Sequence, residues 1–141
     1  MALKIVGNIS GFYTQKLLNT VYMTDSEAAV VGTAYKLSSN RWTKAVDADR
    51  IYAICNKASD AGTNVLGNME LVKVGDIIEA DYTGTADAAF IVGQELCSLG
   101  DADGANVDAA DISGGHLIML EKDTANTKGL FIAVKNFEVA S

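Results

Sequence analysis

The order of apolar and polar residues over positions 30–55 predicts a β-hairpin. An apolar run that ends at Gly32 leads into alternating positions, and a polar tip follows at 38–40. The chain then returns through Trp42 into the apolar run 51–55. Two runs of β-branched and aromatic residues joined by a short polar tip are typical of a hairpin. We expect the rest of the chain to be built around it.

Further strands are indicated after the hairpin, and their apolar runs are bounded by turn residues. The sequence has no proline and 13 glycines, so its turns must be made by Gly, Asn, Asp and Ser. The pattern predicts an all-β fold, a compact barrel-like or sandwich-like domain of short strands. The expected strands lie at 69–74, 77–82, 90–97, 117–122 and 130–135.

The second half of the chain resembles the first at offsets of about 61–65 residues. The run 90–97 parallels 29–36, and 117–122 parallels 52–57. The interpretation is an internal repeat of 30–83 and 90–137, two related β-units that share one core. The alternative is chance similarity between short apolar strands.

Residues 1–29 differ in composition from the remainder, which we expect to form a β-rich domain over 30–141. Six apolar side chains gather there with few charges, too many for a solvated tail. Either the segment packs back on the core, or it is an extended N-terminal arm covered by another chain. These six are Phe12, Tyr13, Leu17, Leu18, Val21 and Tyr22, and the candidate partner-binding residues are Phe12, Tyr13, Leu17, Leu18, Tyr22 and Trp42. Trp42 is a core aromatic or an interface anchor.

The expected core takes apolar residues from most of the predicted strands. Cys55 and Cys97 also lie in apolar runs, which favours two buried reduced thiols, with a disulfide as the alternative. The residues expected to be buried are Val31, Leu37, Ile51, Ile54, Leu71, Ile91, Ile118, Leu120 and Ile132.

The length and the charge of the chain limit its number of domains and the kinds of partner that it can bind. A chain of 141 residues forms one domain or two very small ones. The net charge of -7 is uneven, because residues 1–50 carry a net +2 and residues 51–141 a net -9. An acidic body argues against nucleic-acid binding. No apolar run reaches the length of a membrane span, and the start lacks a signal-peptide pattern, so we expect intracellular synthesis.

No motif in the sequence indicates catalysis or a cofactor. His116 is the only histidine, and no nucleophile motif surrounds it. The acidic run 101–111 partly matches a calcium loop, but Ala105, Asn106 and Ile112 stand where that loop needs a ligand, glycine and glutamate. We therefore expect no enzyme activity, no cofactor and no structural metal.

The run from Gly32 to Leu37, followed by the sequence Arg41-Trp42-Thr43-Lys44-Ala45, an acidic turn and a buried strand, resembles the capsid decoration, or cement, proteins of tailed bacteriophages. A later strand with Val72-Lys73-Val74 extends the similarity over about residues 30–75. The sequence departs from that pattern at Asn40, where glycine is common, and at Tyr52-Ala53-Ile54, where Gly-Ile-Ala is usual.

The resemblance implies an all-β structural protein on the outer capsid surface of a virion, made in the bacterial host cytoplasm. The major capsid protein is the implied partner, with self-association, as a trimer at local threefold positions, and an N-terminal arm on neighbouring subunits. Two other classes stay open. One is a self-assembling tail-tube or baseplate subunit, and the other is a small ligand-binding β-domain.

Overall fold

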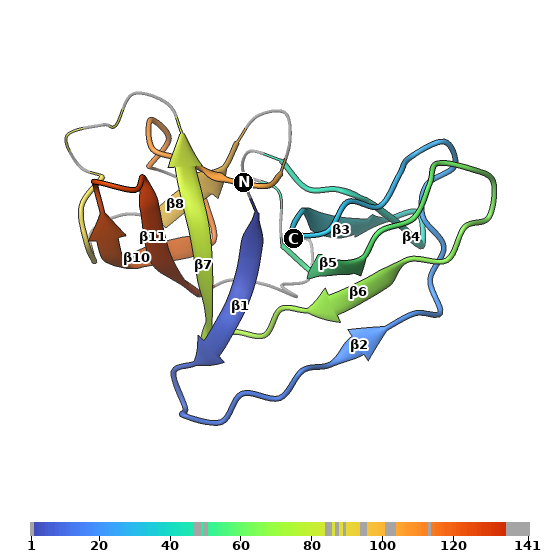
Figure 1. The fold of residues 1–141 in the computed structure, drawn as a ribbon, viewed down its shortest axis with the longest axis horizontal. Helices are drawn as coiled ribbons and strands as arrows, with labels where there is room; N and C mark the ends of the chain where they lie inside the picture. The colour runs from blue at the N-terminus through green and yellow to red at the C-terminus, as the bar shows by residue number, and fades with distance from the viewer. Residues whose placement is uncertain are drawn as a thin grey trace.

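The structure is a computed structural model, and it describes residues 2–46, 49, 51–83, 86, 88, 90–93, 96–100, 104–112 and 114–134. The described residues contain strands and no helix, so the all-β prediction is confirmed (Figure 1). No segment among them is therefore a helix that could span a membrane. The strands are β1 (Leu3–Asn8), β2 (Leu17–Leu18), β3 (Ala34–Ser38), β4 (Arg41–Lys44), β5 (Ala53–Lys57), β6 (Asn68–Leu71), β7 (Asp76–Thr83), β8 (Leu96–Leu99), β9 (Val107–Asp108), β10 (Leu117–Asp123) and β11 (Lys128–Ala133).

Five strands of the C-terminal half close into a barrel. Their order is β7-β11-β10-β8-β9, and a parallel pairing of Tyr82 with Val107 joins β9 back to β7. The inward positions alternate along β7, as expected for a strand with one face on a core. The barrel encloses the large buried side chains Ile78, Phe90, Leu99, Val107, Leu117, Met119 and Phe131. Closure removes the free strand edges within this unit.

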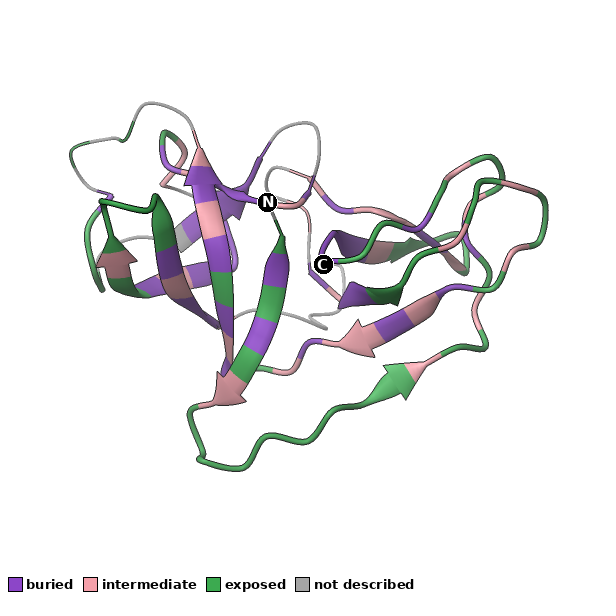
Figure 2. Cartoon of the chain, in the orientation of Figure 1, coloured by how far each residue is buried: buried purple, intermediate pink, exposed green. Residues whose placement is uncertain are grey.

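The second sheet is formed by the N-terminal half, in the order β2-β6-β5-β3-β4. It has its own core, in which Tyr35, Trp42 and Met69 are completely buried. A parallel bridge between Met23 and Trp42 brings the chain just after β2 next to β4. Buried residues occur in both sheets (Figure 2), and the first core extends into the second sheet through Ala34 and Ile54.

The two sheets have the same strand order. Adding five to each label in β2-β6-β5-β3-β4 gives β7-β11-β10-β8-β9. The Met23–Trp42 bridge stands where the parallel β7–β9 pairing stands in the barrel. This correspondence supports the internal repeat, with units at 17–71 and 76–133 in place of the expected 30–83 and 90–137. The repeat itself stays a prediction.

The predicted hairpin is present as β3 and β4. The strands are joined by a two-residue turn, Ser39-Asn40, with φ values of 51° and 62°. Positive φ at both positions is the type I′ turn, whose twist matches that of the flanking strands. Asn tolerates this left-handed conformation, which explains why it can replace glycine here. β5 then pairs antiparallel with β3, so the buried run 51–55 continues the same sheet.

The N-terminal segment divides into two parts. β1 pairs antiparallel with β7 at the outer edge of the barrel, and Leu3 and Ile5 point into the first core. Residues 9–16, which we call the strap, turn at 9–11 and then run without regular secondary structure to β2 (Figure 1). The first part, β1, packs back on the core, which is one of the two predicted alternatives. The strap lies on the surface.

The predicted core is partly wrong. Ile51, Ile54 and Ile132 are buried, and Leu71 and Ile118 are half-buried. Val31, Leu37, Ile91 and Leu120 are exposed. Val31 lies in a turn and Ile91 stands beside one, whereas Leu37 lies near the hairpin tip.

The wrong prediction that Leu120 of β10 is buried has a specific reason. The run 117–120 is apolar at every position, so its pattern cannot say which face turns inward. In the structure Leu117 and Met119 face the core, and a bulge follows Met119. Cys55 and Cys97 are buried and free, in agreement with the prediction of two reduced thiols.

We expect Ile54→Ala to destabilise the protein by about 2–4 kcal/mol, because it removes buried methyl groups and leaves a cavity. Ile54 is 4% exposed and packs in the first core although it lies on a strand of the second sheet. The matched control is Val31→Ala at a 54% exposed position, for which we expect a change within about 0.5 kcal/mol. Chemical denaturation measures both. Equal losses in the two variants would contradict this account of the core.

Candidate partner-binding surface

The strap is fastened to the body at both ends. The backbone N–H of Ile9 donates to the carbonyl of Gly75 at 2.8 Å, and the N–H of Leu71 donates to the carbonyl of Lys16 at 2.8 Å. Gly75 has a φ of +91°, a conformation that favours glycine. A Cβ there would lie 3.1 Å from Cγ2 of Ile9. The close approach of the strap to this turn therefore depends on glycine.

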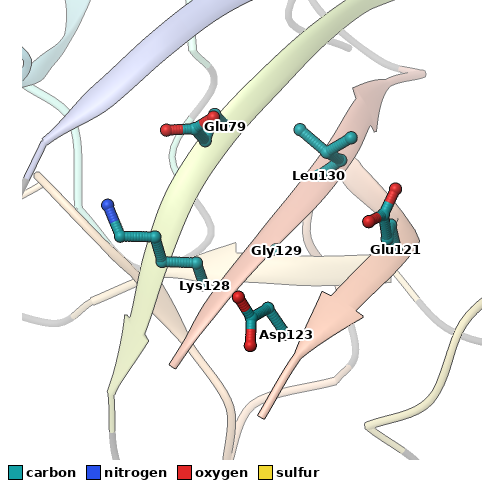
Figure 3. Close-up of a pocket in the computed structure, with 6 residues that line it drawn as sticks. All are labelled: Glu79, Glu121, Asp123, Lys128, Gly129 and Leu130. Atoms are coloured by element: carbon teal, nitrogen blue, oxygen red, sulfur yellow. The ribbon is translucent and has the colours of Figure 1, made fainter. Parts of the chain in front are cut away.

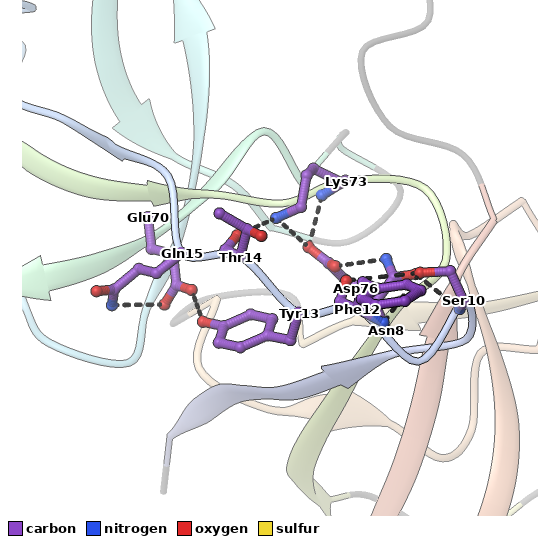
Figure 4. Close-up of polar contacts among 9 residues, drawn as sticks. All are labelled: Asn8, Ser10, Phe12, Tyr13, Thr14, Gln15, Glu70, Lys73 and Asp76. Atoms are coloured by element: carbon purple, nitrogen blue, oxygen red, sulfur yellow. Dashed lines mark hydrogen bonds and ion pairs between the residues drawn. The ribbon is translucent and has the colours of Figure 1, made fainter.

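A buried carboxylate organises the junction between the strap, β1 and β7. The Asp76 side chain is fully buried and accepts hydrogen bonds from Nδ2 of Asn8 at 2.8 Å and from the backbone N–H of Lys73 at 2.8 Å. Nζ of Lys73 lies 3.2 Å from Asp76 and donates to the carbonyl of Thr14 at 3.0 Å. Figure 4 shows these contacts converging on Asp76. One ion pair thus links the end of β1, the turn before β7 and the strap.

A second set of contacts holds the middle of the strap against β6. The Tyr13 hydroxyl donates to the Glu70 carboxylate, and Nε2 of Gln15 donates to the other oxygen of that carboxylate (Figure 4). Partial desolvation and the neighbouring Glu70 raise the pKa of Tyr13 well above its usual value. The Tyr13 hydroxyl therefore stays protonated and keeps its role as donor across the physiological pH range.

Three large apolar side chains are strongly exposed where the strap leaves the barrel. Phe12 is 83% exposed, Ile9 68% and Val74 61%. We call these residues the tip patch. Ile9 adjoins the turn that contains Val74 and Gly75, and Phe12 lies beside the Asn8–Asp76 junction (Figure 4). Exposed apolar side chains grouped on a held support are a mark of interaction surfaces.

The structure places the other candidate residues at different depths. Leu17 and Tyr22 are exposed, and the Arg41 guanidinium lies 5.4 Å from the centre of the Tyr22 ring. Leu18 and Val21 are partly buried against the second core. Trp42 is completely buried there, so it is a core aromatic and does not reach the surface.

Sequence reasoning missed two parts of this surface. The sequence predicts Val74 as the end of a half-buried strand, but the strand ends at Leu71 and Val74 lies in the turn that follows. Asp76 reads only as a turn residue, although it is the buried anchor of the junction. The spacing Lys73-Val74-Gly75-Asp76 is the one local signal, because an aspartate after glycine can accept the N–H of a residue three positions earlier.

One hollow on the barrel gathers charged side chains. A shallow pocket on the barrel is lined by the carboxylates of Glu79, Glu121 and Asp123 with Lys128 beside them (Figure 3). Hydrogen bonds from Asn126 lower the pKa of Asp123. Within the described ranges, no group of three or more His, Cys, Asp or Glu residues is placed to hold a metal ion.

Two other candidates from the sequence can be located only in part. Residues 101–103 of the acidic run lie outside the described residues, so the prediction about metal there stays a prediction. His116 is 8% exposed at the start of β10, and its carbonyl accepts the N–H of Val134. That position agrees with a strand-entry histidine.

Comparison with known proteins adds no further assignment. No family model matches the chain, and neither the curated proteins nor the solved structures include a match.

We expect Asp76→Ala to destabilise the protein by about 1–3 kcal/mol, because it leaves the donors of Asn8 and Lys73 without their buried acceptor. Asp60→Ala removes an exposed carboxylate and serves as the control. Thermal unfolding followed by circular dichroism measures the difference. An Asp76→Ala variant that melts with the control would show that the junction does not depend on this carboxylate.

Proposed function

We propose that this protein is a structural virion protein that binds the outer surface of a phage capsid and stabilises the shell. The tip patch is the observation that supports the proposal most directly. A phenylalanine that is 83% exposed on a segment held by an ion pair and backbone hydrogen bonds is unusual for a surface without a partner. The major capsid protein is the proposed partner, through the resemblance over residues 30–75.

The charge distribution fits such a surface. Residues 1–24 contain Lys4 and Lys16 and no acidic residue, whereas residues 51–141 carry a net -9. The strap is thus the least acidic part of an acidic protein. A neutral to basic contact surface suits an acidic partner, and the acidic body would then face away from it.

The architecture supports a scaffold role. Two compact all-β units carry the strap between them, and its ends are tied to both (Figure 1). Holding the segment in this way lowers the entropy that must be lost when a partner covers it. Lack of enzyme activity, the outer-capsid location and a trimer at local threefold positions are further parts of the proposal.

Co-sedimentation with empty shells of the virus that encodes the protein tests the proposal. We expect the wild-type protein to pellet with the shells and Phe12→Ser to lose at least about tenfold in affinity, because an exposed aromatic anchor is removed. The matched control is Val92→Ser, since Val92 is 50% exposed on the barrel away from the strap.

Two outcomes would contradict the proposal in different ways. Failure of the wild-type protein to pellet would refute decoration of the shell. Equal loss in both variants would instead refute the assignment to the tip patch. Deletion of residues 1–22 is a poor test, because it removes Leu3 and Ile5 from the first core and would destabilise the barrel.

A further inference from the structure

Among the described residues, no strand covers the outer edge of β2, although the same position in the barrel is filled. β2 corresponds to β7 in the shared strand order, and β7 has β1 paired along its outer edge. β2 ends its sheet, and none of the described strands pairs with its outer side (Figure 1). An open edge presents backbone donors and acceptors to any strand of suitable sequence.

The register of β2 shows which backbone groups face outward. The N–H of Leu71 donates to the carbonyl of Lys16, and Leu17 then stands opposite Glu70. Because bonding directions alternate along an antiparallel ladder, the N–H and C=O groups of Gln15 and Leu17 point away from β6. Both side chains are exposed as well. The free edge is therefore built of accessible, correctly spaced hydrogen-bonding groups.

The sequence around this edge is chemically symmetric about Leu17. At several positions, the residues that lie equally far before and after Leu17 are of similar chemical type. Amides stand at 15 and 19, threonines at 14 and 20, and an aromatic and a β-branched residue at 13 and 21. In a two-fold antiparallel pairing centred on Leu17, each residue faces its counterpart. The Thr14–Thr20 and Tyr13–Val21 pairs lie beyond residues 15–19, so the amide pair of Gln15 and Asn19 is the one that falls within the ladder.

Charge does not oppose the pairing. Lys16 is the only charged residue between positions 9 and 24, and in this register it faces Leu18 of the second copy. No like charges stand directly opposite each other, which is the arrangement that destabilises strand pairs. Apolar Leu17, 42% exposed in the single chain, would lie against its own counterpart at the two-fold axis.

We propose that two copies of this chain associate through antiparallel pairing of their β2 edges, centred on Leu17. The Leu17 N–H of each copy donates to the Leu17 carbonyl of the other, and Gln15 exchanges hydrogen bonds with Asn19. The ladder is limited to residues 15–19, because the chain bends at Thr20. This contact needs no shell, so it goes beyond the proposed function.

Cross-linking tests the register directly. In a hydrogen-bonded antiparallel pair the Cα atoms lie about 5.5 Å apart, within the range that a disulfide spans. We expect Leu17→Cys to form a covalent dimer under mild oxidation. Gln15→Cys is the control, because its two copies would be offset by four residues, about 13 Å along the strands. The native cysteines are buried and do not interfere.

The cross-linking result can overturn the proposal in two ways. Equal cross-linking of both variants would indicate random collision. Absence of a covalent dimer for Leu17→Cys would exclude the pairing centred on that residue.

Sedimentation equilibrium tests the backbone contact without cysteine. Proline at position 15 removes an N–H that points outward and leaves the bonds to β6 in place, as proline on a strand edge permits. We expect Gln15→Pro to raise the dimer dissociation constant at least about tenfold. Gln15→Ala keeps the N–H, loses the same side chain and should dimerise as the wild type does.

Thermal unfolding shows whether both position-15 variants keep the fold. A wild-type protein that is monomeric at every concentration would refute the proposal. Equal dissociation constants for the two folded variants, or a trimer that neither variant changes, would refute it as well. If Gln15→Pro does not fold, the cross-linking pair decides the question.

Discussion

The ion pair between Asp76 and Lys73 is the interaction on which the arrangement of the chain depends. Asp76 is fully buried, and a buried carboxylate is tolerated only when its oxygens are paired and hydrogen-bonded. Here the pairing groups come from β1, from the turn before β7 and, through Lys73, from the strap. The junction of β1, the turn before β7 and the strap is therefore fixed by electrostatics. The two sheets themselves meet through apolar packing, because Ala34 and Ile54 of the second sheet belong to the first core.

The two sheets have the same strand order, but their edge strands are covered to different extents. The C-terminal unit is closed by the parallel pairing of β7 with β9 and also carries β1 along β7. The N-terminal unit has only a bridge at the corresponding position and leaves β2 at its margin. Natural sheets protect their edges by closure, charge or partners. The short β2 has one lysine beside it and keeps an edge on which no described strand pairs.

The sequence was sufficient for the elements whose signals are local. The Ser39-Asn40 turn, the hairpin around it and the strands at β7, β10 and β11 follow from turn chemistry and apolar runs. Burial was harder to predict, because runs such as 117–120 are apolar on both faces, and only the bulge after Met119 and the packing decide which face turns inward. The candidate surface was found in part, since Phe12 and Tyr13 stand out by composition. The role of Asp76 could not be predicted, because Asp76 accepts a hydrogen bond from Asn8, which is 68 positions away in sequence.

The position of Trp42 makes the second sheet observable by itself. It is the only tryptophan of the chain, it is completely buried in the second core, and its indole N–H has no hydrogen-bond partner in the structure. Its fluorescence therefore reports the apolar surroundings of one unit, while the other unit contributes only tyrosine and phenylalanine. Circular dichroism reports both units together. Agreement or disagreement between the two signals during unfolding would distinguish one cooperative molecule from two units that open separately.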